Sequence, residues 1–318
     1  MGRVPANAVD IVDLAKTYRG MGKAPPKHAL EGISLTVARG EMFGLLGPNG
    51  AGKSTFMKLI TGQLRPSQGR LEVLGEPVWS NPAIYRRMGF CPEQDAFYER
   101  MTGLDWVTAL VRLNGYGEDE ARAAAREALA LVDLLPVADR KIGAYSKGMR
   151  QRVKLAQSLA HQPELVVLDE PLTGMDPLMR RSTIRAIRQW ARQGRHVIVS
   201  SHILHEVEAM TSNILLINNG RIVADGDVHQ IRDLLDMHPH TVSLRAAEPR
   251  LLAQHLLREE GVLSLRLSDG QLVVETRRPD TFYARVTALA ASGEAGAIDA
   301  IESTDDNLQA VFRYLVKA

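Results

Sequence analysis

The segment "GPNGAGKST" (47–55) constrains the fold more than any other part of the 318-residue chain. It follows the short apolar run "MFGLL" (42–46), which is typical of a buried strand, and a helix is predicted from about Lys53. A glycine-rich turn between a strand and a helix directs backbone N–H groups and the positive end of the helix dipole toward one point, where phosphate binds. The segment also fits G-x-x-x-x-G-K-[ST] at every fixed position. We therefore expect the phosphate-binding loop of an α/β nucleotide-binding domain.

The residue types of this loop predict separate contacts to a bound nucleotide. Lys53 is expected to reach the β- and γ-phosphates, and the hydroxyl group of Ser54 is expected to bind Mg²⁺. The ligands implied are ATP and Mg²⁺. The other expected nucleotide-binding positions of the loop are Gly47, Asn49, Gly50, Gly52 and Thr55.

A second chemical signal is "LVVLDE" (165–170), in which four apolar residues precede two acids. Ligand groups of α/β sheets lie at the carboxyl ends of strands. Asp169 is the expected partner of Mg²⁺, and Glu170 suits the general base that activates a water molecule. His202 follows the predicted strand "HVIVSS" (196–201), where it is expected to polarise that water or the γ-phosphate.

The composition is that of an ordinary globular protein, with 45% apolar and 24% charged residues. Cys91 is the only cysteine, so a disulfide framework is excluded and a reducing, cytosolic setting fits. A net charge of +2 does not favour nucleic-acid binding. Because no apolar run approaches the roughly 18–20 residues of a membrane span, we expect any membrane part on another chain.

The pattern of apolar residues divides the chain into two predicted domains. Residues 1–235 read as an α/β core whose strands are interrupted by a helical segment at about 95–161. Near the N-terminus, 8–13 and 33–37 read as short strands and 20–29 as the loop between them. Residues 236–318 show the order βαββαβ, followed by a helix at 305–317. This order predicts a small α+β domain of the ferredoxin-like kind, with an accessory or regulatory role.

Together these parts resemble the nucleotide-binding domain of ABC transporters over about residues 8–235. "GPNGAGKST" resembles the Walker A motif, "LVVLDE" the Walker B motif, and "LTGMDP" (172–177) the D-loop with Asp176 in the matching place. His202 falls at the switch histidine, and Tyr18 resembles the aromatic residue that stacks on adenine. The resemblance implies a P-loop NTPase fold with an antiparallel β subdomain and a helical insert.

The stretch "YSKGM" (145–149) is similar to the LSGGQ signature of the same family, with Lys147 in place of the first glycine and Met149 in place of the glutamine. In that family two domains pack head to tail, and the signature of one closes over the ATP of the other. The resemblance therefore implies that a second ATPase subunit, in a homodimer, receives this turn on its ATP. The residues concerned are Ser146, Lys147, Gly148 and Met149. A plain N-cap role for Ser146 is compatible with this one.

The segment "GFCPEQD" leaves one assignment open. Glu93 occupies the position of the family's Q-loop glutamine, and Gln94 lies one residue later. Glu93 would approach Mg²⁺ as a carboxylate, whereas a shift of one residue would bring Gln94 there instead.

Several stretches resemble the ATPases of ABC-2 type exporters, among them "YSKGMRQR" and "DPLMRR". The resemblance implies ATP-driven export at the cytoplasmic face of the cell membrane, with a multi-span permease on a separate chain. It also places a docking groove for that permease in the segment 96–106, with Phe97, Tyr98, Met101 and Trp106 as candidates. The alternatives are an import ATPase, a mechanochemical ABC ATPase acting on a soluble assembly, and a membrane-docked ATPase that transports nothing.

Overall fold

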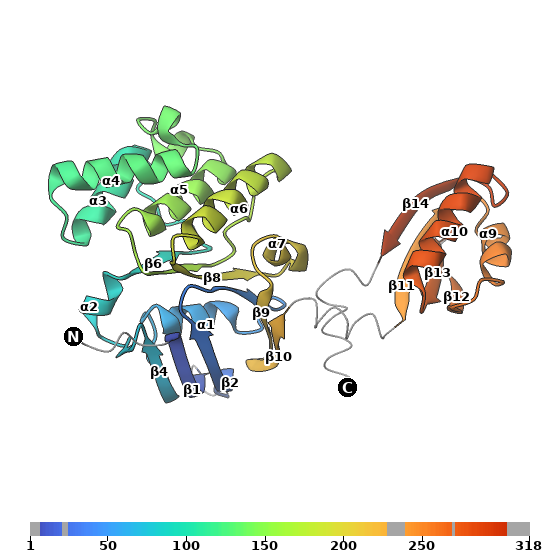
Figure 1. Ribbon diagram of the computed structural model, residues 1–318, viewed down its shortest axis with the longest axis horizontal. Helices are drawn as coiled ribbons and strands as arrows, with labels where there is room; N and C mark the ends of the chain where they lie inside the picture. The colour runs from blue at the N-terminus through green and yellow to red at the C-terminus, as the bar shows by residue number, and fades with distance from the viewer. Residues whose placement is uncertain (1–6, 21–24, 228–238, 269–270, 304–318) are drawn as a thin grey trace. The chain divides into compact units, whose positions relative to one another are not determined.

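The computed structural model describes residues 7–20, 25–227, 239–268 and 271–303. The chain divides into two compact units, Met1–Gly226 and Asp227–Ala318, each described below by itself (Figure 1). The boundary predicted near residue 235 falls between the described ranges. The accessory or regulatory role of the second unit stays a prediction.

The first unit is built on a six-stranded sheet with the order β10-β9-β3-β8-β7-β6. Strands β9, β3, β8, β7 and β6 run parallel, and β7 and β8 are buried along their whole length because helices and the second sheet cover both faces. The central position of β8 brings the carboxyl ends of β3 and β7 to either side of it. The strands are β3 (Met42–Leu46), β6 (Met88–Cys91), β7 (Leu165–Leu168), β8 (His196–Ser201), β9 (Asn213–Asn218) and β10 (Arg221–Asp227).

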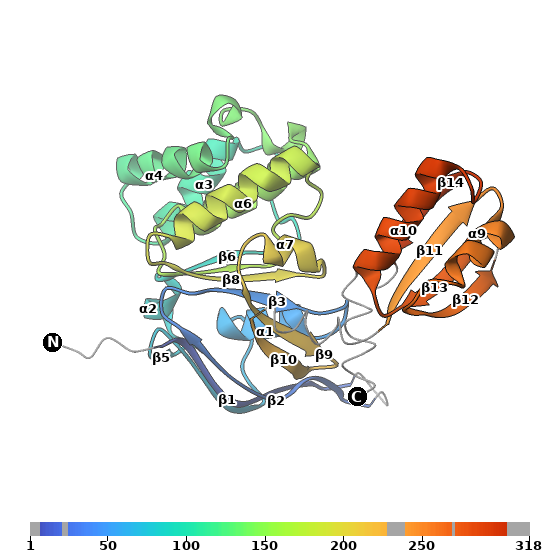
Figure 2. The ribbon, with the colours of Figure 1, turned by 45° about the vertical axis from the view of Figure 1, so that its right-hand side comes forward.

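A second, antiparallel sheet with the order β2-β1-β4-β5 packs on the other side of helix α1 (Lys53–Ile60). Figure 2 shows α1 between the two sheets, where its side chains Phe56 and Ile60 share one core with both. The predicted loop at 20–29 is wrong at its end, because Lys27–Ala29 belong to β2; backbone pairing with β1 extends the strand beyond its apolar stretch. The strands are β1 (Asn7–Tyr18), β2 (Lys27–Ala38), β4 (Gln68–Val73) and β5 (Glu76–Pro77), and the short helix α2 is Pro82–Tyr85.

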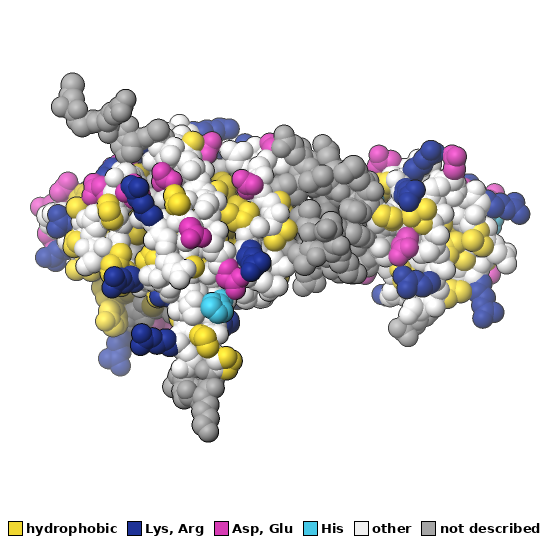
Figure 3. Space-filling model, turned by 90° about the horizontal axis from the view of Figure 1, so that it is seen from below, with side chains coloured by type: hydrophobic (Ala, Val, Ile, Leu, Met, Phe, Trp, Pro, Cys, Tyr) yellow, Lys and Arg dark blue, Asp and Glu magenta, His cyan; other side chains and the backbone are white. Residues whose placement is uncertain are grey.

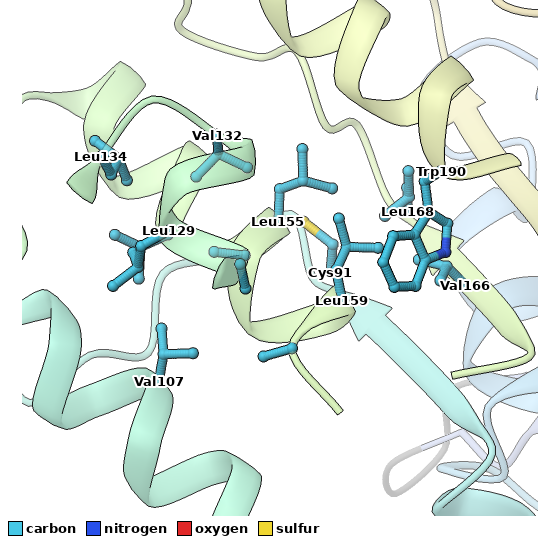
Figure 4. Packing of buried hydrophobic residues seen from close by; sticks show 14 of the residues in the cluster. Cys91, Val107, Leu129, Val132, Leu134, Leu155, Leu159, Val166, Leu168 and Trp190 are labelled. Atoms are coloured by element: carbon cyan, nitrogen blue, oxygen red, sulfur yellow. The ribbon is translucent and has the colours of Figure 1, made fainter. Parts of the chain in front are cut away.

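The helical insert lies between β6 and β7 in the chain and packs its helices into one core (Figure 4). Val107, Leu129 and Leu155 come from three different helices and meet in this core, which continues to Cys91 on β6. The insert contains α3 (Gly103–Leu113), α4 (Glu118–Leu131), the 3-10 turns η1 (Leu135–Val137) and η2 (Ile142–Ala144), and α5 (Lys147–Leu159). Two further helices, α6 (Pro177–Ala191) and α7 (Leu204–Glu208), flank β8 in the chain.

The second unit has the order β11-α9-β12-β13-α10-β14, which is the βαββαβ order predicted from the sequence. Its antiparallel sheet has the strand order β12-β13-β11-β14. Strand β13 therefore lies between β11 and β12, and β11 lies between β13 and β14. Its core includes Val242, Leu244, Leu252, Phe282 and Leu289. The helix predicted at 305–317 lies outside the described residues. The elements are β11 (His240–Ala246), α9 (Pro249–Leu256), β12 (Val262–Ser268), β13 (Gln271–Thr276), α10 (Pro279–Ser292) and β14 (Ile298–Ser303).

The surface of the described residues is mixed in charge. On the face of the molecule in Figure 3, basic and acidic side chains are interspersed, in keeping with the small net charge of +2. None of the helices in the described part of the chain combines the length and the apolar character that crossing a membrane requires.

Gly89 on β6 marks a close approach between the central sheet and the insert. A methyl group at this position would overlap the backbone carbonyl oxygen of Ser158 on α5, and a backbone atom cannot move aside as a flexible side chain can. A glycine is therefore required here to let α5 pack on β6.

We expect Gly89→Ala to destabilise the first unit by about 3 kcal/mol, the upper end of the usual cost of overpacking a core. Urea unfolding followed by tryptophan fluorescence measures this unit alone, because all three tryptophans, Trp79, Trp106 and Trp190, belong to it. The control is Gly117→Ala, where an added methyl group meets no atom within 4 Å and where a loss below about 1 kcal/mol is expected. Equal losses in the two variants would contradict the packing argument.

Candidate nucleotide site

A pocket of about 820 Å³ lies at the carboxyl ends of β3 and β7. It brings together residues that are far apart in the chain, from β1, from the loop before α1, and from the segments after β6, β7 and β8. Gly47 is not among the lining residues, but its carbonyl group accepts a hydrogen bond from Lys53, which does line the pocket. The predicted site residues that line the pocket are Tyr18, Asn49, Gly50, Gly52, Lys53, Ser54, Thr55, Glu93, Asp169, Glu170 and His202.

The phosphate loop is held in shape by Gly52, the residue before α1. Its φ of 110° lies in the left-handed region, and an added methyl carbon would lie 2.7 Å from the carbonyl oxygen of Ala29 on β2. Only glycine fits both conditions without strain. The residues at the start of α1 line the pocket, and the free N–H groups of a helix N-terminus are suited to binding phosphate.

Lys53 is buried beneath the loop, with 7% of its surface exposed. Its ammonium group donates to the carbonyl oxygen of Gly47 at 2.7 Å and lies 3.8 Å from Oε1 of Glu170. Burial lowers the pKa of Lys53, while the nearby carboxylates of Glu170 and Asp169 act in the opposite direction. The site therefore holds the Lys53 cation beside the carboxylates of Glu170 and Asp169. The negative charge of a polyphosphate would pair with this cation.

Asp169 and Glu170 are fixed by a residue that the sequence reasoning missed, Ser200 on β8. The Ser200 hydroxyl donates to Oδ1 of Asp169 at 2.6 Å and accepts from the backbone N–H of Glu170 at 3.0 Å. The signal was visible in the sequence, because two serines end the otherwise apolar run "HVIVSS". Ser200 thus joins the ends of β7 and β8 at the point where the acids leave the sheet.

Glu170 has a left-handed backbone, with φ of 49°. This conformation is uncommon outside glycine and costs about 1–3 kcal/mol, so surrounding contacts must stabilise it. One of them comes from Gln151 on α5, whose buried amide donates to the Glu170 carbonyl oxygen at 3.2 Å. The strained turn directs the carboxylate into the pocket.

The structure brings the two predicted catalytic residues together. Nδ1 of His202 lies 2.9 Å from Oε2 of Glu170, although the two residues follow different strands. Burial raises the pKa of Glu170, and the charges of His202 and Lys53 oppose that shift. A carboxylate whose pKa is raised is a stronger base, as proton abstraction from water requires.

Tyr18 lies at the rim of the pocket, at the end of β1. The residue is 38% exposed, and its hydroxyl oxygen lies 3.5 Å from the Thr55 hydroxyl oxygen. A partly exposed ring beside the phosphate loop is available for stacking with a flat base.

Of the two residues left open after β6, Glu93 lines the pocket and Gln94 is not among the lining residues. The Glu93 backbone carbonyl accepts a hydrogen bond of 2.5 Å from the buried ammonium group of Lys154, which also pairs with Asp95 at 3.0 Å. This anchor on α5 fixes the backbone at Glu93, and of the two candidates Glu93 is the one that the fold places at the pocket.

The predicted signature and D-loop residues lie elsewhere. Ser146 caps α5 by accepting from the Met149 N–H at 3.2 Å, and Asp176 caps α6 by accepting from the Met179 N–H at 2.9 Å. Neither they nor the neighbouring residues Lys147, Gly148 and Met149 line the pocket of their own chain.

The two caps belong to one surface, because the turns that carry them are packed together. The side chain of Lys147 crosses Gly174 so closely that a methyl carbon there would lie 2.6 Å from Cδ of the lysine. At Gly148 an added methyl carbon would lie 2.9 Å from the sulfur of Met179. We call the exposed residues Ser146, Lys147 and Asp176 the outer face.

The oxygen donors of the pocket fit a hard divalent cation. Within the described ranges no group of three or more His, Cys, Asp and Glu side chains is arranged to hold a metal ion. Ser54, Asp169 and Glu93 nevertheless present a hydroxyl and two carboxylates to one pocket. This set suits Mg²⁺, which is usually bound by one or two protein oxygens together with phosphate oxygens and water.

A strand, phosphate loop and helix beside an acid pair on a parallel sheet define a P-loop ATP-binding domain. The family model described as ABC transporter matches residues 30–173. An uncharacterized ABC transporter ATP-binding protein of Synechocystis is 35% identical over 259 residues, which cover 80% of this chain and 72% of that protein. The daunorubicin/doxorubicin resistance ATP-binding protein of Streptomyces peucetius is 34% identical over 271 residues, 85% of this chain and 80% of that protein.

Other relatives are much longer. ATP-binding cassette sub-family A member 7 of rat is 32% identical over 322 residues, which cover 99% of this chain but 15% of that protein. Among solved structures, an ATP binding subunit of an ABC transporter is 29% identical with a TM-score of 0.63, covering 72% of this chain and 93% of that one. The dimeric ATP-binding cassette MJ0796 bound to ADP and Pi, at 24% identity and a TM-score of 0.64, covers 69% of this chain and 98% of that one and shares the fold.

The chain belongs to the ATP-binding proteins of ABC transporters, and it is an ABC-type ATPase. The predicted fold, a P-loop domain with an antiparallel β subdomain and a helical insert, is confirmed.

We expect Lys53→Ala to weaken ATP binding at least about 30-fold, because removing one partner of a buried charge pair typically costs 2–5 kcal/mol. Equilibrium titration with ATP measures the affinity. Lys58→Ala is the control, since Lys58 has the same charge and lies on the same helix but is exposed. Unchanged affinity in Lys53→Ala would contradict the phosphate-loop assignment.

Proposed function

We propose that this chain powers export through a membrane-spanning permease on a separate chain, at the cytoplasmic face of the cell membrane. The proposal is supported by its similarity to a bacterial drug-resistance ATP-binding protein of which it covers 80%. One observation carries the mechanism. Some of the residues expected to contact ATP line the pocket, and the others lie on the outer face.

A head-to-tail homodimer would bring the two sets together. Within the outer face, Ser146 carries a hydroxyl group, Lys147 is a cation and α5 begins, all of which favour the γ-phosphate of an ATP bound elsewhere, whereas the Asp176 carboxylate caps α6. Leu178, next to this face, is 78% exposed and offers apolar surface for the same contact. ATP would then act as the link between two chains, and its binding energy would drive their closure.

Within each pocket the residues take separate roles. Tyr18 stacks on adenine, and the phosphate loop with Lys53 holds the phosphates. Ser54, Asp169 and Glu93 would hold Mg²⁺, which would supply positive charge opposite the phosphate oxygens. Glu170 accepts the proton of the attacking water, and His202 holds the γ-phosphate or that water in position. Hydrolysis removes the link, so the two chains separate.

The permease would dock on an aromatic cluster at the start of the insert. The rings of Phe97 and Tyr98 meet that of Trp106 edge-on, with centroids 5.5 Å and 5.8 Å apart. Tyr98 is 73% exposed, and the Trp106 indole donates to the side chain of Gln157 on α5 at 2.6 Å. Because α5 follows directly on Ser146, force applied to this cluster would reach the outer face along one helix. Met101, the remaining candidate of this segment, is half-buried.

We expect Glu170→Gln to keep ATP affinity and to lower turnover by about 10²–10⁴-fold, the usual cost of removing a general base. Phosphate release at saturating ATP and Mg²⁺ measures turnover. Glu127→Gln on the exposed side of α4 makes the same chemical change away from the pocket and should hydrolyse ATP normally. Turnover of Glu170→Gln near the wild-type rate would remove Glu170 as the base.

The permease assignment is tested by recovering tagged Glu170→Gln from detergent-solubilised cells with ATP and Mg²⁺, followed by mass spectrometry. A multi-span membrane protein in matching amount is expected. Adding Tyr98→Ala should reduce that recovery, whereas Leu113→Ala, a change at another exposed side chain of the insert, should not. Recovery of soluble proteins only would contradict the export proposal and leave the ATPase assignment intact.

A further inference from the structure

Ser200 and Ser201, at the end of β8, point to opposite sides of the strand. Of the two, only Ser200 contacts Asp169 and Glu170. The Ser201 hydroxyl instead donates to Oε2 of Glu206 on α7 at 3.0 Å and accepts from the backbone N–H of Ile203 at 3.0 Å. The second bond spans the backbone of His202, so it closes a tight turn around that residue.

The Glu206 carboxylate is buried, with 6% of the residue exposed, and it has a second partner. Nη1 of Arg180 on α6 lies 3.1 Å from Oε1 of Glu206. The same guanidinium donates through Nε to the carbonyl oxygen of Met175 at 3.1 Å, next to Asp176. Glu206 is therefore held between the turn of His202 and the start of α6.

His202 needs such an external restraint. Its side chain is 47% exposed, so packing limits its orientation only weakly, and its function depends on the 2.9 Å contact with Glu170. A displacement of about 1 Å in a catalytic group can cost up to about 100-fold in rate. Even a paired buried carboxylate such as that of Glu206 often contributes no more stability than an apolar side chain of similar volume, so stability alone does not account for a glutamate here.

We propose that Glu206 is a positioning residue for His202. Its hydrogen bond to Ser201 fixes the turn that directs the imidazole at Glu170, and Arg180 holds the carboxylate in that place. The inference rests on the proposed role of His202 in ATP hydrolysis.

A double-mutant cycle on the full chain separates this role from a general effect on stability. Glu206→Gln is expected to lower turnover about tenfold with less than about a twofold change in the KM for ATP. In a His202→Ala background the same change should lower turnover less than about twofold further, because Glu206 acts through the histidine. Phosphate release followed over hours resolves the slow variants.

Two controls accompany the cycle. Arg180→Ala should reproduce the loss of Glu206→Gln. Arg188→Ala, further along α6, removes a similar hydrogen bond, from Nη1 to the Ala209 carbonyl oxygen at 3.4 Å, and should keep normal turnover. If Glu206→Gln unfolds, Ser201→Ala removes a single hydroxyl from the same path and should show the same dependence on His202.

Three outcomes are distinguishable. Equal losses from Glu206→Gln with and without His202 would overturn the positioning role. So would normal turnover in both Glu206→Gln and Ser201→Ala while His202→Ala is slow. Normal turnover of His202→Ala would instead remove His202 from the proposed function, and with it the inference that depends on it.

Discussion

Parallel pairing of β8 with both β3 and β7 is the constraint on which the rest of the site depends. Val199 pairs with Gly44 on one side and with Leu168 on the other, so the three strands end at nearly the same level. The phosphate loop leaves β3 at that edge, and the acids leave β7. Burial of the strands on both faces fixes this register, since a slip of one residue would exchange their side chains between two packed cores.

The chemistry follows from burying unlike charges at that edge. Lys53 and Glu170 are both nearly inaccessible, and burial disfavours the charged form of each: it lowers the pKa of Lys53 and raises that of Glu170. Their proximity partly offsets these shifts. In the proposed mechanism a phosphate group of ATP would take up the charge of the lysine and leave the Glu170 carboxylate to act as a base.

Residues such as Lys53 and Glu170, which line the pocket, could be singled out from the sequence because they belong to local patterns, while their roles stay predictions. A glycine-rich turn before a helix and acids after an apolar run are recognisable without knowing what lies beside them. Ser200 and Gln151 were missed because their partners are 31 and 19 residues away in the chain, and Glu206 because its partner Arg180 lies on another helix. Helix α7 was missed as well, since five residues are too few to show a helical period. The sequence could not decide between Glu93 and Gln94, because the two are adjacent and only the folded chain shows which of them lines the pocket.

The outer face can contact ATP only if a second chain binds to it. Sedimentation equilibrium of Glu170→Gln, with ATP and Mg²⁺ or with ADP, tests this dimer directly. The account predicts a species of twice the 35.0 kDa chain mass with ATP and a monomer with ADP. A monomer at ATP concentrations that saturate the pocket would contradict it.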